Sequence, residues 1–77
     1  MRDTIERLRR WAITYRGVGS DEKAELLDRA VASLLKNVTD NALAAELLAM
    51  ALVCETDANQ ASAVTDMRAA AAVLAKS

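Results

Sequence analysis

The sequence contains no histidine, no proline and no phenylalanine, and it has one cysteine and two glycines among 77 residues. A zinc site of the histidine and cysteine type, a cysteine–histidine catalytic pair and a disulfide framework are therefore excluded. The scarcity of glycine and proline leaves too few turn-forming residues for a fold of many short strands. These absences favour a small all-α protein, and they point to no cofactor and no metal.

Alanine dominates what is present, with 17 alanines in a chain that is 53% apolar and 3% aromatic. Burying an alanine stabilises a fold far less than burying a leucine, because the hydrophobic effect scales with apolar area. Ordering a chain of this length costs on the order of 100 kcal/mol of conformational entropy. The composition therefore predicts one small domain, residues 1–77, that gains part of its burial by self-association.

Hydrophobic periodicity predicts a bundle of three to four helices, over residues 3–16, 20–36, 40–54 and 57–75. Asp3 with Glu6, and Asp57 with Gln60, fit the capping-box pattern at a helix start. Ser20 is placed to cap the second helix. No proline enforces a break near residue 57, so two separate helices or one bent helix both fit the last third of the chain.

Each predicted helix has an apolar face that should form the core. Its members are Ile5, Leu8, Trp11, Ala12 and Tyr15 in the first helix, Ala24, Leu27, Ala30, Val31, Leu34 and Leu35 in the second, Leu43, Leu47, Met50, Ala51 and Cys54 in the third, and Ala63, Val64, Met67, Ala70, Ala71 and Leu74 in the fourth. Cys54 has no cation close in sequence that would activate its thiol, so we interpret it as a small buried hydrophobe.

The third predicted helix is apolar nearly all round, with a second apolar face formed by Ala45, Leu48 and Leu52. Three other short helices can barely surround such a helix, so we expect this face to be the self-association surface of a homodimer. Thr39 or Asp40 is placed to cap its start.

Glu46 is the one charge within that apolar run. We expect its carboxylate to face water, because unpaired carboxylates are rarely buried. The alternative is an ion pair across the dimer, with Arg29 or Arg68 as the partner.

Positive charge is concentrated in residues 1–16, which carry a net charge of +3 in a chain of net charge −1. Arg2, Arg9 and Arg16 repeat every seven residues and so lie on one helix face, with Ile13 beside them. We predict that these four residues bind a protein partner. A solvated basic face without a partner fits the same pattern.

These features predict a small non-enzymatic protein-binding module, such as an adaptor, inhibitor or regulator, that acts as a homodimer. The alternative is a nucleic-acid-binding regulator that uses the basic first helix. Base readout by the second helix is disfavoured, because that helix would present Asp21, Glu22, Glu25 and Asp28 to the phosphates, whereas contact of the first helix with the nucleic-acid backbone stays open. An enzyme is least supported, since catalysis would rest on scattered carboxylates.

A cytoplasmic location is expected from the apolar runs of the chain. The longest, residues 42–54, is too short to cross a bilayer, and the N-terminal run is too short for a signal peptide.

Overall fold

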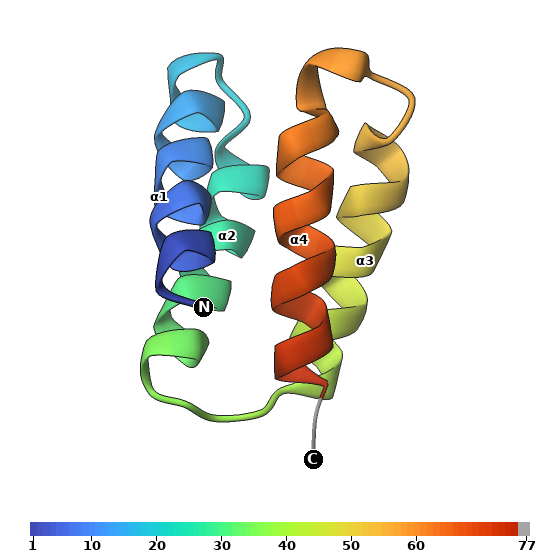
Figure 1. Cartoon of the computed structure of the whole chain (residues 1–77). Coiled ribbons are helices and arrows are strands. Elements are labelled where there is room, and N and C mark those ends of the chain that lie inside the picture. Colours follow the sequence, from blue (N-terminus) through green and yellow to red (C-terminus); the bar gives the residue numbers. More distant parts are fainter. Residues whose placement is uncertain (76–77) are drawn as a thin grey trace.

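Two antiparallel helical hairpins pack side by side in the computed structural model, which describes residues 1–75 (Figure 1). The elements are α1 (Arg2–Gly17), α2 (Asp21–Leu35), α3 (Asn41–Cys54), the 3₁₀ turn η1 (Ala58–Gln60) and α4 (Ala61–Leu74). The first hairpin contains α1 and α2, and the second contains α3 and α4. The all-α four-helix bundle predicted from periodicity is confirmed. No helix among these residues is long and apolar enough to span a membrane.

The turns between helices use the few residues that tolerate a left-handed backbone. Gly19, between α1 and α2, has a φ of 83°, and Asn37, after α2, has a φ of 57°. Asparagine adopts this conformation more readily than other residues that carry a side chain, so Asn37 ends α2 where glycine is absent.

Asp40 and Asp57 cap helix starts through their side chains as predicted, whereas Ser20 stands at the N-cap position of α2 without a side-chain hydrogen bond and Asp3 is not a cap. Asp40 caps α3, since its Oδ1 accepts a hydrogen bond of 3.0 Å from the Leu43 amide. The Asp3–Glu6 capping box is wrong. Helix α1 begins at Arg2 after Met1, which places Asp3 inside the first turn with no side-chain cap.

The third and fourth predicted helices are separate, and the chain reverses between them. Asp57 does not begin α4 directly. Its Oδ1 accepts a bond of 2.9 Å from the Asn59 amide, which starts η1, and α4 follows from Ala61. The Gln60 side chain donates to Asp57 Oδ2 at 2.9 Å. Polar capping chemistry therefore replaces proline as the helix breaker here.

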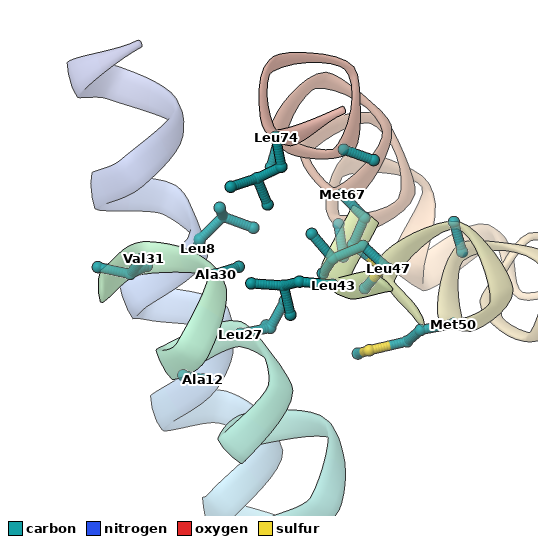
Figure 2. Packing of buried hydrophobic residues seen from close by; sticks show 14 of the residues in the cluster. Leu8, Ala12, Leu27, Ala30, Val31, Leu43, Leu47, Met50, Met67 and Leu74 are labelled. Carbon is teal, nitrogen blue, oxygen red and sulfur yellow. The ribbon is translucent and has the colours of Figure 1, made fainter. Parts of the chain in front are cut away.

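The core lies between the two hairpins and is built from leucine, methionine and alanine. Figure 2 shows Leu8, Leu27, Leu43 and Leu74 converging from all four helices. The predicted core residues of α3 and α4 are all buried. In α2 the prediction for Leu35 is wrong, because this last residue of the helix lies at the margin of the buried stripe and remains 57% exposed. Ile5 and Trp11 of α1 are partly buried against the core.

Candidate interaction surfaces

The outward face of α3 is mostly apolar, with the exposed Glu46 at its edge. Leu48 is 46% exposed, Leu52 is 63% exposed, and Ala45, one turn before Leu48, is exposed too. Val53, on the same outward arc, is 70% exposed. The opposite face of the helix, which includes Leu43 and Leu47, is buried in the core. The sequence-predicted self-association residues therefore lie together on a surface that the single chain leaves in contact with water.

Ion pairs flank this face on both sides. Arg29 of α2 donates to Glu46 at 3.1 Å, and Arg68 of α4 donates to Glu55 at 2.6 Å, just beyond the end of α3. Glu46 is exposed, in agreement with the expectation that it faces water. Its pairing with Arg29 occurs within one chain, whereas the alternative placed this pair across a dimer. The apolar face of α3 is thus bordered by charges contributed from both neighbouring helices.

The outward face of α4 extends the uncharged surface. Its exposed or half-exposed residues other than Arg68 are all small or β-branched, namely Ala61, Ser62, Thr65, Ala69, Ala72 and Val73. Within α3 and α4, the exposed charged residues are Glu46 and Arg68, whereas α1 and α2 carry exposed charges on nearly every turn. Charge is therefore segregated to the first hairpin.

The predicted partner-binding residues lie on one exposed face of α1. Arg2, Arg9 and Arg16 are exposed, and the Ile13 side chain is 70% exposed among them. Arg16 pairs with Asp28 of α2 at 2.5 Å, and this hydrogen-bonded carboxylate raises the pKa of the arginine. Arg2 and Arg9 have no ion-pair partner among residues 1–75. The structure therefore places the four residues on one face, and one of the three arginines, Arg16, is already paired within the chain.

A shallow groove between α1 and the end of α2 adjoins this face. It is lined by Arg2, Ile5, Glu6, Arg9 and Leu35. The sequence pattern assigned Leu35 to the core, and for that reason did not identify this groove. The exposed side chain of Leu35 gives the groove its apolar wall.

A part-buried ion pair between α1 and α4 was not predicted from the sequence. The Asp66 side chain is 5% exposed, and its Oδ1 accepts a 3.0 Å hydrogen bond from Arg7 Nε. Arg7 Nη2 also donates to Thr4 Oγ1 at 3.3 Å, and Asp66 Oδ2 has no hydrogen-bond partner. The spacing of Asp66 three residues after Ala63 places it near the buried face of α4, which is the one local indication of its burial.

Tyr15 forms a further polar link between the hairpins, besides the Arg29–Glu46 and Arg7–Asp66 pairs. Its hydroxyl donates to Gln60 Oε1 at 2.8 Å. Burial raises the pKa of Tyr15 well above its ordinary value, and the neighbouring Cys54 and Asp57 act in the same direction. Cys54 is buried, as the sequence predicted. The Arg7–Asp66 and Tyr15–Gln60 contacts join α1 to the α4 side of the bundle, and the Arg29–Glu46 pair joins α2 to α3.

Metal-ligating side chains are not gathered into a cluster in the described part of the chain. Histidine is absent from the sequence, and no group of three or more cysteine, aspartate or glutamate side chains among residues 1–75 is placed to hold a metal ion. No protein-family model, curated protein or solved structure matches this chain. The function is therefore inferred from the outward face of α3 and the arginine face of α1.

Proposed function

We propose that this chain is a small non-enzymatic protein-binding module, in the manner of an adaptor, inhibitor or regulator, and that it acts as a homodimer joined through α3. The observation that carries the proposal is the exposed apolar face of α3, with Leu48 and Leu52 at its centre. Interfaces typically combine an apolar centre with a polar rim, and the ion pairs of Glu46 and Glu55 supply such a rim.

A second copy of α3 is a suitable occupant for this face. Ala45, Leu48 and Leu52 follow the three-and-four spacing of a helix–helix seam. In an antiparallel pair, Leu52 of each copy lies opposite the small Ala45 of the other, and the two Leu48 side chains meet near the centre. A parallel pair would instead set like against like, leaving a gap between the two alanines. The antiparallel arrangement therefore gives the better packing.

The exposed area supports a weak dimer. Fully burying a leucine or valine contributes about 1.5–3 kcal/mol. Covering the exposed parts of Leu48, Leu52 and Val53 then contributes about 3–5 kcal/mol per chain. Association itself costs about 4–15 kcal/mol in lost translational and rotational freedom. The two chains together gain about 6–10 kcal/mol, so at most about 6 kcal/mol remains after the smallest association cost, and we expect dimers to form at about tens of micromolar or above.

The arginine face of α1 supplies the second contact surface of the module. Arg2, Arg9 and Ile13 are exposed on it, and charge there would steer association toward an acidic partner. A nucleic acid is less well suited to the same face, because Arg16 is already paired with Asp28 and the acidic start of α2 lies beside it.

The proposal is tested by sedimentation velocity across a concentration series. Wild-type protein should change from monomer to dimer as its concentration rises, and the Leu48→Glu variant should remain monomeric, because it places a charge at the centre of the apolar face. The matched control is Leu35→Glu, which changes another exposed leucine on α2 and should leave dimerisation unchanged. Far-UV circular dichroism establishes that all three chains are folded.

Two outcomes contradict the dimer. One is a wild-type protein that stays monomeric at the highest concentration reached. The other is a Leu48→Glu variant that dimerises as strongly as wild type.

A further inference from the structure

The groove between α1 and the end of α2 combines unpaired positive charge with exposed apolar side chains. Arg2 and Arg9 stand on α1 at one side of it, with no ion-pair partner among the described residues. Glu6 is the one acidic residue in the lining. The local charge is therefore positive and available to a ligand.

Apolar contact in the groove comes from both helices. Ile5 is partly buried at its floor, and Leu35 forms its wall on α2 with 57% of its surface in water. Ile13 lies one turn beyond Arg9 on the same face of α1 and is 70% exposed. Arginine is among the residues enriched at interface hot spots, and the exposed aliphatic side chains beside Arg2 and Arg9 add apolar surface for a partner to cover.

We propose that this groove docks an acidic amphipathic helix from another protein. The inference rests on the protein-binding part of the proposed function and does not require the α3 dimer. A helix laid along the groove would place leucine-like side chains against Ile5, Leu35 and Ile13, in the manner of helix-in-groove recognition. Its acidic side chains would pair with Arg2 and Arg9.

The spacing of the arginines specifies the ligand further. Arg2 and Arg9 are separated by two turns of α1, which is a rise of about 10 Å. A partner helix lying nearly parallel or antiparallel to α1 therefore needs carboxylates about seven residues apart, flanking its apolar stripe. The apolar groove wall and Glu6 make this ligand a better fit than a nucleic acid, which would bring phosphates and no aliphatic surface.

The test is selection from a displayed library of helical peptides, with leucine fixed along one face and every other position random. Selection against the wild-type chain should enrich aspartate and glutamate next to the leucines, with a preference for seven-residue spacing. Binding of a selected peptide, measured by fluorescence anisotropy, should weaken as salt concentration rises. The Arg2→Glu/Arg9→Glu variant should lose about tenfold or more in affinity.

Matched controls separate the groove from the rest of the surface. Arg10→Glu reverses the charge of one exposed, unpaired arginine of α1 that does not line the groove, and it should leave peptide affinity within about twofold of wild type, whereas Arg2→Glu and Arg9→Glu made singly should each weaken binding by more than that. Leu35→Ser should weaken binding, whereas Leu52→Ser on α3 should not. Leu48→Glu should still bind the peptide even if it abolishes dimerisation, so failure of the dimer and failure of the groove are distinguishable.

Three results overturn the inference. The first is a selection that yields no binders or binders without acidic enrichment. The second is a selected peptide that binds the Arg2→Glu/Arg9→Glu variant as tightly as wild type. The third is a DNA or RNA duplex that binds through Arg2 and Arg9 at physiological salt where acidic peptides do not, which would assign the face to nucleic acid.

Discussion

Arg7 and Asp66 form one ion pair, but we expect Arg7→Ala and Asp66→Ala to lower the stability of the protein by different amounts, because the Asp66 carboxylate is buried. Its Oδ1 accepts from Arg7, while its Oδ2 is buried with no hydrogen-bond partner. Arg7→Ala leaves this carboxylate buried and uncompensated, and it also removes a hydrogen bond to Thr4. Asp66→Ala removes the carboxylate together with its unsatisfied oxygen, and it frees Arg7, whose side chain is already 49% exposed, to be solvated.

The expected magnitudes follow from that asymmetry. Breaking a fully buried pair by removing one partner costs about 3–5 kcal/mol. Because Arg7 is half exposed and water can reach the vacated space, we expect Arg7→Ala to lower the free energy of unfolding by about 2–3 kcal/mol. Asp66→Ala should cost less than about 1 kcal/mol, helped by the high helix propensity of alanine.

Urea denaturation followed by far-UV circular dichroism measures both variants. For a chain of this size, each kcal/mol corresponds to a change of about 4–8 °C in Tm, so thermal melts provide a second readout. Arg10→Ala is the matched control, since it truncates an exposed and unpaired arginine of α1, and it should change stability by less than about 0.5 kcal/mol. Asp66→Ala proving more destabilising than Arg7→Ala would refute the reasoning.

Three further predictions concern local interactions. Burial raises the pKa of Tyr15 above that of an unfolded tyrosine, near 10, so the folded state keeps the phenol proton at a pH where the unfolded state loses it. The contribution of Tyr15 to the free energy of unfolding should therefore be fully present below about pH 10 and fall above it. Urea melts at alkaline pH should show a weaker pH dependence for Tyr15→Phe than for wild type. Asp40→Ala should cost about 1 kcal/mol of unfolding free energy, because the Leu43 amide loses its cap; an unchanged melt would contradict this role. Asn37→Gly should preserve or slightly raise Tm, whereas Asn37→Ala should lower it by the equivalent of about 1 kcal/mol, because Asn37 has a left-handed backbone; equal melts for the two variants would exclude that cause.

Local patterns in the sequence were sufficient to predict the four helices and most of the core. The stripes of α3 and α4 are buried as the three-and-four spacing indicated, since a helix in a bundle buries one face whatever its partners are. Asp40 was recognisable as a cap because its hydrogen bond reaches three residues along the chain. The exposure of Leu48 and Leu52 was also foreseen, because α3 has more apolar surface than the other helices can cover.

Features that depend on distant partners were not predictable in this way. Arg7 and Asp66 are 59 residues apart in sequence, and the Tyr15–Gln60 bond spans 45 residues. Their contacts depend on how the two hairpins face each other, which no local spacing reveals. Leu35 was misplaced for a related reason, because a residue at the end of a helix is covered only if a neighbouring helix extends that far.

The central claim, that a second copy covers the outward face of α3, is tested most directly by an NMR dilution series. Amide resonances are recorded for uniformly ¹⁵N-labelled protein from low to high concentration. Association through α3 predicts concentration-dependent shifts at Ala45, Leu48 and Leu52, with little change along α1 and α2. Resonances of α3 that stay constant over the whole series, or shifts confined to the first hairpin, would contradict the claim.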